Sequence, residues 1–252
     1  MLIDTHAHLA FKDFNEDIDE VIQRAKDAGV EKIINTACDL ESCEKVFEMQ
    51  EKYPFLYPSL GLHPYDSELL TDDLLAKWRE ILSSGKVVAI GETGLDYFKC
   101  KVDKEIQKNS FRKHLELAKE FNLPVIVHNR DSDEDCLDVL QEFPEVKAVF
   151  HCFASSLEFA KKIWELAYFT SFTGIITYPN SDNLKEIVQH VPLDQFMVET
   201  DCPYLAPQAY RGKRNESSYV VEVAKRIAEI KGLSYEEVAD ISTKNASSFF
   251  AI

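Results

Sequence analysis

The sequence has no hydrophobic run long enough to cross a membrane and no segment with the composition of a linker. Its apolar stretches fall short of the ~18 residues that a membrane span needs, and its first residues lack the basic segment of a secretory signal. Gly/Ser tracts, proline tracts and low-complexity runs are also missing. The 252 residues, 45% of them hydrophobic, suffice for one large core. We therefore expect a soluble, cytoplasmic protein that does not enter a membrane, folded as a single domain over residues 1–252.

Paired cysteines and positive charge are scarce as well. The six cysteines include no CxxC pair, which predicts reduced thiols rather than a disulfide framework. Lys and Arg number 28 against 44 Asp and Glu, so the formal net charge is −16. A protein that gripped nucleic acid over a broad surface would be expected to be basic. An anionic substrate would therefore have to be bound locally, with help from metal ions.

Short β-branched runs alternate with amphipathic stretches along the whole chain. The runs begin about 28 residues apart, the period of a strand followed by a helix. They are Leu2–His8, Lys32–Thr36, Phe55–Leu62, Val87–Gly91, Pro124–His128, Lys147–His151, Phe169–Thr173 and Phe196–Asp201. Helical stretches include Asp17–Ala28, Leu40–Lys52, Asp72–Leu82, Glu105–Phe121, Ser217–Lys231 and Ser234–Phe249. Asp72 and Ser156 are predicted helix caps, and Gly29 and Gly85 are predicted helix stops.

Eight such alternations predict a parallel sheet, because a crossover helix must return the chain to the start of each new strand. A closed barrel and an open doubly wound sheet are both compatible with this pattern. The number of units and the absence of a Gly-rich phosphate loop favour an α/β fold of the (β/α)₈ TIM-barrel type.

Polar residues fall at the ends of the predicted strands, where such a barrel places its chemistry. Five of the seven histidines lie there, together with two acids. The set is His6, His8, His63, Glu92, His128, His151 and Asp201. A lone buried histidine is usually a satisfied core residue, but burying this whole set at one barrel mouth would be costly without metal.

The inventory predicts two divalent metal ions. His6 and His8 are two residues apart on a strand, so they point to the same side and can bind one ion together. Asp201 would complete this set, since the first and last strands are neighbours in a closed barrel. A second set is Glu92, His128 and His151, and Glu92 has two oxygens with which to bridge the ions.

Three further acidic or histidine residues stand beside these sets. His63 is left over and is a candidate to contact substrate. Asp4 and Glu199 lie two residues before His6 and Asp201, one layer deeper. They are either buried polar groups satisfied by backbone or, as we favour, residues that orient a ligand above them.

Seven segments that carry these residues occur in an order that resembles the TatD-like metal-dependent hydrolases, the TatD-type deoxyribonucleases of the amidohydrolase superfamily. They are DTHAHL (4–9), GLHP (61–64), GETGLDY (91–97), PVIVHNR (124–130), HCFASS (151–156), ETDCPYLAP (199–207) and YRGKRNE (210–216). The resemblance spans the whole chain. It implies a TIM barrel, a divalent-metal centre and phosphodiester hydrolysis at DNA ends, and it marks the same six metal residues.

Two departures from the family pattern concern the loops. Ala154-Ser155-Ser156 stands where members often have Ser-Gly-Ser, and Ser217 stands where proline is common. Neither departure touches a predicted ligand. They bear on the fit of the substrate rather than on the metal centre.

The expected reaction uses water activated by the metal as nucleophile. Asp201 would accept its proton, Glu92 would hold the ions, and His63 would donate to a phosphoryl oxygen. The ions expected are Zn²⁺, Mg²⁺ or Mn²⁺, and the expected partner is DNA, with single-stranded ends as one candidate.

The cations nearest these strand ends are candidates for binding the substrate. Arg211, Lys213 and Arg214 follow the last strand, and Arg130 follows the fifth. The alternative for the loop is that its arginines pair with Glu216 or other surface acids. Two other functions stay open: a metal-dependent amide or ester hydrolase, such as an aminoacyl-tRNA deacylase or small-molecule amidohydrolase, and a metal-binding protein without turnover.

Overall fold

The computed structural model describes residues 1–252, and the chain groups into two compact units. Unit 1 consists of Met1–Asn35 and Cys152–Ile252, and unit 2 consists of Thr36–His151. Eight strands follow one another in the sheet in sequence order, β1 to β8. This order and the alternation with helices are those of the predicted (β/α)₈ fold.

Unit 1 contains the two ends of the chain. Its elements are β1 (Leu2–Ala7), α1 (Ile18–Asp27), β2 (Val30–Asn35), α6 (Leu157–Glu165), β7 (Phe169–Phe172), α7 (Asp182–His190), β8 (Phe196–Val198), α8 (Val220–Lys231) and α9 (Tyr235–Phe250). β1 pairs with β2 and β7 with β8, all in parallel. A parallel bridge between Ala7 and Cys202 places the end of β1 beside the segment that follows β8.

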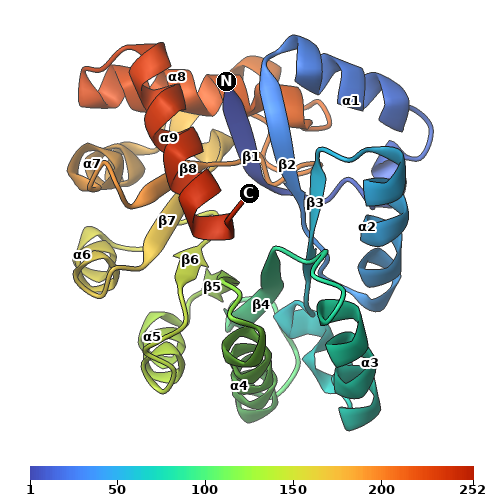
Figure 1. The fold of residues 1–252 in the computed structure, drawn as a ribbon. Helices are drawn as coiled ribbons and strands as arrows, with labels where there is room; N and C mark the ends of the chain where they lie inside the picture. The colour runs from blue at the N-terminus through green and yellow to red at the C-terminus, as the bar shows by residue number, and fades with distance from the viewer. The chain divides into compact units, whose positions relative to one another are not determined.

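Helix α9 forms hydrogen bonds with β8 near its N-terminal end, opposite the end that is followed by Cys202. Asn245 donates from Nδ2 to the carbonyl oxygens of Leu193 and Phe196, at 2.8 Å in each case. The backbone N–H of Val198 donates to Ser242 Oγ at 3.1 Å. α9 therefore runs against β1 and β8, as the ribbon shows (Figure 1). It covers the N-terminal face of these strands, which in such a barrel serves stability rather than chemistry.

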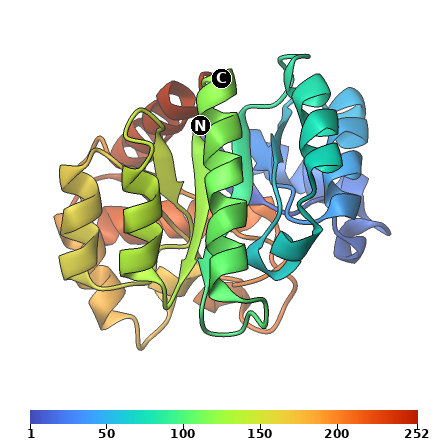
Figure 2. The ribbon, with the colours of Figure 1, turned by 90° about the horizontal axis from the view of Figure 1, so that it is seen from below.

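Unit 2 is built from four consecutive strands and their helices. Its elements are α2 (Leu40–Lys52), β3 (Leu56–Leu60), the 3₁₀ segment η2 (Pro64–Leu69), α3 (Asp72–Leu82), β4 (Ala89–Asp96), α4 (Lys104–Phe121), β5 (Val125–Arg130), α5 (Asp133–Gln141) and β6 (Ala148–Phe150). β3, β4, β5 and β6 pair in parallel in that order. Figure 2 shows α4 in green beside α5 in yellow-green, as the crossover connections require.

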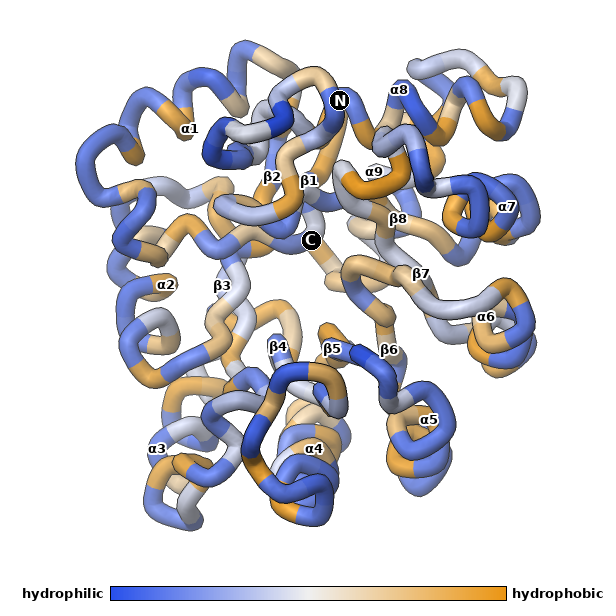
Figure 3. Tube along the Cα trace, turned by 180° about the vertical axis from the view of Figure 1, so that it is seen from behind, coloured by the Kyte–Doolittle hydropathy of each residue, from blue (hydrophilic) through white to orange (hydrophobic).

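The helices form because apolar residues recur on one face of each. On α4, Phe111, Leu115 and Ala118 are separated by four and three residues and are fully buried. Figure 3 shows this pattern as alternating orange and blue along the tubes of α4 and α5. No helix in the structure combines the length and apolar character that a membrane crossing requires.

The predicted caps and stops are confirmed except at one position. Ser156 caps α6 by accepting from the backbone N–H of Phe159 at 3.1 Å, and Gly29 and Gly85 have the positive φ of helix stops. Asp72, predicted as a cap, is the first residue of α3. Thr71 caps that helix instead, because its hydroxyl accepts from the N–H of Leu74.

Each of the eight strands differs from its predicted range at one or both ends. β2 begins at Val30 rather than at residue 32, and β8 is shorter than predicted, so Asp201 lies beyond the strand. β4 was expected to end at Gly91 but continues to Asp96. Glu92 therefore lies inside a strand, and Asp96 joins the same face four residues later.

Candidate metal centre

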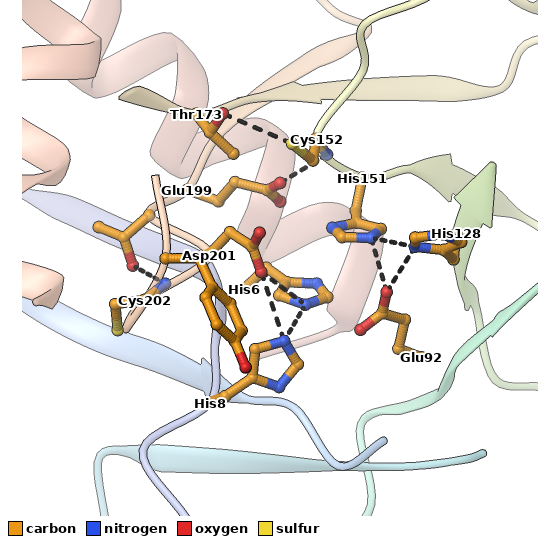
Figure 4. Close-up of polar contacts among 12 residues, drawn as sticks. His6, His8, Glu92, His128, His151, Cys152, Thr173, Glu199, Asp201 and Cys202 are labelled. Carbon is orange, nitrogen blue, oxygen red and sulfur yellow. Dashed lines mark hydrogen bonds and ion pairs between the residues drawn. The ribbon is translucent and has the colours of Figure 1, made fainter. Parts of the chain in front are cut away.

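His6, His8 and Asp201 form a donor set within unit 1. The two imidazoles alternate on β1 and point to the same side, with His6 Nε2 and His8 Nε2 3.1 Å apart. Asp201 Oδ1 lies 3.7 Å from His6 Nε2 and 3.3 Å from His8 Nε2. Figure 4 shows the three side chains turned toward one another. The structure thus brings together the set that the sequence predicted from the first and last strands.

Backbone hydrogen bonds fix the ends from which these side chains project. The N–H of Asp201 donates to the carbonyl oxygen of His6, and the N–H of His8 donates to that of Cys202, both at 2.9 Å. Residues that are far apart in the chain are therefore held side by side by the main chain. The position of the donor set follows from the strand register rather than from mobile side chains.

The spacing of these donors fits a divalent ion. Ligands about 2.0–2.1 Å from a tetrahedral ion lie about 3.3 Å from one another. The separations of 3.1, 3.3 and 3.7 Å bracket that value. Two imidazole nitrogens and a carboxylate oxygen are also suitable ligands for Zn²⁺ or Mn²⁺. The types of donor atom in this set and the distances between them thus both suit a divalent ion.

A second donor set lies within unit 2, on β4, on β5 and directly after β6. Glu92 Oε1 is 2.8 Å from His151 Nε2 and 2.9 Å from His128 Nδ1, and these two nitrogens are 3.4 Å apart. All three side chains face one another in Figure 4. Although burial disfavours the imidazolium, hydrogen bonds with Asp96 and Glu92 raise the pKa of His128. The two carboxylates thus stabilise a positive charge on His128.

Asp96 is a site residue that sequence reasoning missed. Its Oδ2 atom lies 3.2 Å from His128 Nε2 and accepts a hydrogen bond from the Tyr65 hydroxyl at 3.2 Å. Burial disfavours its charge, but hydrogen bonds from His128 and from two backbone N–H groups hold the pKa of Asp96 below its usual range. A carboxylate on the far nitrogen of a ligating imidazole fixes its orientation. The four-residue spacing from Glu92 was the available signal.

His63 lies beside the second set and is electrically neutral. Its Nδ1 accepts from the N–H of Tyr65 at 3.2 Å, so the ring proton sits on Nε2. Burial lowers the pKa of His63 to about 3, and the attraction of Glu92 does not offset this. Nε2 is 3.7 Å from Glu92 Oε1. His63 thus presents an N–H donor at the site, and its role as a substrate contact stays a prediction.

Asp4 and Glu199 are buried beneath the first set, and backbone and hydroxyl groups satisfy them. Asp4 accepts from the N–H of Thr200 at 2.9 Å and from its hydroxyl at 2.7 Å. Glu199 accepts from the N–H of Cys152 at 2.6 Å and from Ser171 Oγ at 2.5 Å. Burial raises the pKa of Asp4 to about 7. Through these bonds to Thr200, Asp4 fixes the backbone next to Asp201. This effect does not require Asp4 to contact an imidazole ring.

The sequence profile described as TatD related DNase matches residues 3–251. The chain belongs to the TatD family of metal-dependent hydrolases. Among its TatD-family relatives, the Bacillus subtilis (strain 168) protein named "Uncharacterized metal-dependent hydrolase YabD" is 45% identical over 254 residues, which cover 100% of both chains. The protein of Escherichia coli (strain K12) named "Uncharacterized metal-dependent hydrolase YcfH" is 36% identical, over 100% of this chain and 96% of its own length.

Solved structures of the TatD family match over almost the whole chain. The TatD homologue YJJV from Escherichia coli k12 has a TM-score of 0.93 and 33% identity, covering 100% of this chain and 98% of that one. A TatD-family hydrolase from Entamoeba histolytica has a TM-score of 0.89 and 27% identity, covering 98% and 97%. Together with the strand order, these matches confirm the predicted (β/α)₈ TIM-barrel fold.

The predicted substrate-binding cations of this TatD-family chain differ in their surroundings. Arg214 donates to both carboxylate oxygens of Asp17, at 2.8 and 2.6 Å, and packs over the Phe14 ring. It therefore matches the alternative of pairing with an acid. The guanidinium of Arg211 lies 4.1 Å from the centroid of Tyr178, while Lys213 and Arg130 are exposed. All six cysteines are free thiols, as the sequence predicted.

Proposed function

We propose that this TatD-family hydrolase cleaves phosphodiester bonds in DNA, working inward from an end of a strand. The observation that carries the proposal is the pair of histidine–carboxylate sets, accompanied by the neutral N–H donor of His63. Such sets are typical of metal-assisted hydrolysis, in which a carboxylate and an N–H donor assist the reaction. The name of the family profile, which refers to a DNase, supports the choice of substrate.

The residues that would hold the metal are the two sets described above. His6, His8 and Asp201 would bind one ion, and Glu92, His128 and His151 would bind another, with Zn²⁺, Mg²⁺ or Mn²⁺ as candidates. A divalent ion bound there would supply Lewis acidity and would lower the pKa of a nearby water molecule. Asp96 would keep the His128 ring in place from its other nitrogen.

The protein's own groups would handle the proton and the phosphate charge. Asp201 is a carboxylate at the rim of its set, with a side chain that is 14% exposed, so it can accept a proton from water. His63 would donate its Nε2–H to a phosphoryl oxygen, where negative charge increases in the transition state. Because burial keeps the pKa of His63 low, this donor stays neutral and is not repelled by a cation.

A metal-dependent amide or ester hydrolase, including an aminoacyl-tRNA deacylase, is the second candidate. The net charge of −16 favours it, since a polyanion is repelled at long range. The engagement of Arg214 by Asp17 also favours it, because that guanidinium is already paired. The two functions share the metal centre and differ in what binds beside it.

A substrate panel separates the two functions. Protein treated with chelator and then reconstituted with Zn²⁺, Mg²⁺ or Mn²⁺ is assayed on single-stranded and duplex DNA labelled at the 5′ or the 3′ end, on a small phosphodiester, on simple amides and on an aminoacyl ester. We expect stepwise shortening of single-stranded DNA in at least one metal and none in chelator. The Asp201→Asn variant is the control for contaminating nuclease. Turnover of amides or the aminoacyl ester without DNA cleavage would replace the proposal with the second candidate.

A further inference from the structure

An aromatic side chain is exposed at the C-terminal end of β4. Phe98 is 57% exposed in the loop that joins β4 to α4, and Tyr65 on η2 is 46% exposed. Both are held in place: the N–H of Phe98 donates to Asp96 Oδ1 at 2.9 Å, and the Tyr65 hydroxyl donates to Asp96 Oδ2. The Arg130 guanidinium packs on the Phe98 ring, 4.3 Å from its centroid. Main-chain and side-chain contacts therefore anchor this aromatic platform.

The platform is continuous with the second donor set. Asp96, which holds Phe98 and Tyr65, also contacts His128 Nε2. The Tyr65 ring lies 4.3 Å from the ring of His63, and the His63 ring lies 4.3 Å from that of His128. If one group of a ligand bound at the second donor set, the adjoining groups of that ligand would therefore lie within reach of Tyr65 and Phe98.

The same loop carries positive charge in a chain that is strongly acidic. Lys99 and Lys101 are exposed, as is Arg130 at the end of β5. None of the three forms an ion pair, which distinguishes them from Arg214 and its bidentate contact with Asp17. We call Tyr65, Phe98, Lys99, Lys101 and Arg130 the Phe98 surface. Its combination of an exposed ring and unpaired cations is complementary to a base with adjoining phosphates.

We propose that the Phe98 surface binds single-stranded nucleic acid, with one base stacked on Phe98 and phosphates contacted by Lys99, Lys101 and Arg130. The inference rests on the proposed phosphodiesterase function and names the strand presented to that site. A single strand is favoured over a duplex because the faces of its bases are free to stack on a protein ring. Arg130 on the ring adds a cation–π contact and a charge near the backbone.

The stacking is tested by combining Phe98→Ala with removal of a base from the strand. Metal-loaded wild-type and variant proteins are titrated with phosphorothioate-linked oligothymidine and with versions carrying single abasic positions near one end. Stacking contributes about 1–3 kcal/mol per base, so Phe98→Ala should weaken the binding of the full oligonucleotide about 5- to 150-fold. Removal of the stacked base should weaken wild-type binding equally, and the variant should then show little further loss.

Matched variants separate stacking from general damage. Phe98→Tyr keeps the ring and should retain tight binding. Leu193→Ala truncates another exposed apolar side chain, located before β8, and should leave binding unchanged. With cleavable DNA, Phe98→Ala should raise KM with little change in kcat, since the contact is shared by ground and transition states.

The lysines are tested by the dependence of binding on salt. Removing both in Lys99→Ala/Lys101→Ala should make the slope of log K against log salt shallower by about 1.4, at about 0.7 for each contact on a single strand. Lys185→Ala/Lys225→Ala changes the net charge equally at two helix positions that pair with acids, and its slope should stay that of the wild type.

The outcomes distinguish this inference from the proposed function. Suppose that wild-type protein cleaves DNA while Phe98→Ala binds the full and abasic strands like wild type. The proposed binding of nucleic acid by the Phe98 surface is then wrong, and the proposed phosphodiesterase function is retained. If wild-type protein cleaves no phosphodiester, the proposed function fails, and the binding titrations still decide the inference. Binding that is absent, or that ignores both the base and the ring, overturns it.

Discussion

Asp96 divides its two oxygens between a backbone loop and two ring systems. Oδ1 accepts from the N–H groups of Phe98 and Lys99, at 2.9 and 2.8 Å, while Oδ2 faces His128 and Tyr65. One carboxylate thus positions a predicted metal ligand and the loop beside it. The residue was missed because the predicted strand ended at Gly91: glycine weakens a strand interior, and with Gly91 and Gly94 so close together, positions 92–96 were not assigned to β4.

Replacing Asp96 by Asn separates its two tasks. The amide can still accept from the loop N–H groups through Oδ1, but its NH₂ group cannot accept from His128 or Tyr65. We expect metal affinity or activity to fall about 10- to 100-fold, as for other carboxylates behind a ligating histidine. Chelator competition measures the affinity. Tyr65→Phe removes only the hydroxyl and is the control; an equal loss there would assign the effect to Tyr65.

His63 is expected to act on substrate rather than on metal. His63→Ala should keep the metal content of the wild type and should lower kcat about 10²–10³-fold, the usual effect of removing a donor that stabilises developing charge. Elemental analysis and steady-state kinetics on the same preparation check both parts. Loss of an ion from the variant would instead make His63 a ligand, which its 3.7 Å distance from Glu92 Oε1 would permit.

Among the elements, α4 holds the end of β3 through a buried histidine. His114 donates from Nδ1 to the carbonyl oxygen of Ser110 at 2.7 Å, and its Nε2 accepts from the N–H of Leu62 at 3.0 Å. Both ring nitrogens are used, so the imidazole must be neutral. Burial accordingly lowers the pKa of His114 to about 4. Leu62 precedes His63, so this bond also fixes the backbone at the site.

The titration of His114 predicts how stability depends on pH. Below pH 6.5 the unfolded chain binds a proton that the folded chain does not, so the free energy of unfolding should fall from pH 6.5 down to about pH 4. The loss amounts to roughly 3 kcal/mol, since one pKa unit corresponds to about 1.4 kcal/mol. Urea unfolding of chelator-treated protein measures it. In His114→Gln, whose amide can make both hydrogen bonds, this part of the decline should be absent; a curve that superimposes on wild type would refute the assignment.

Helices and strands differed in how well their bounds could be predicted. α2, with bounds Leu40–Lys52, was predicted without error because an acidic cap precedes its apolar periodicity. β8 was predicted too long because no Gly or Pro follows Val198 until Pro203, while the ladder to β7 already ends at Val198. Thr71 was missed as a cap because Asp72 has the same preference, and only the hydrogen bond to Leu74 distinguishes them.

For the whole molecule, the fold and the residues of the two donor sets could be predicted from the sequence. Which lysine and arginine side chains form ion pairs with acids could not. Eight strand–helix repeats indicate a barrel, and even spacing places His6 and His8 on one face. The pairing of Arg214 with Asp17 joins positions far apart in sequence through the packing of unit 1. No local pattern reveals such a contact, so paired and unpaired arginines look alike in the sequence.

The whole protein should bind two divalent ions, one at each donor set. His128→Ala and Asp201→Asn should each lower the metal content of replete protein from two equivalents to one, because they remove a donor from different sets. Elemental analysis after gel filtration gives the count. Metal should also raise the Tm, since binding to the folded state alone stabilises it. A wild-type content that never exceeds one equivalent would eliminate the two-ion hypothesis.

The pairing of β1 with the segment after β8 determines when, during synthesis of the chain, the first donor set can form. His8 and Asp201 are contributed from opposite ends of the sequence, and their backbones meet only once Cys202 has been made. At about 5–20 residues per second, this leaves β1 waiting about 10–40 s on the ribosome. Glu92, His128 and His151 are all synthesised within that interval. The donor set that is begun first is thus completed last, after the segment carrying the other set has been made.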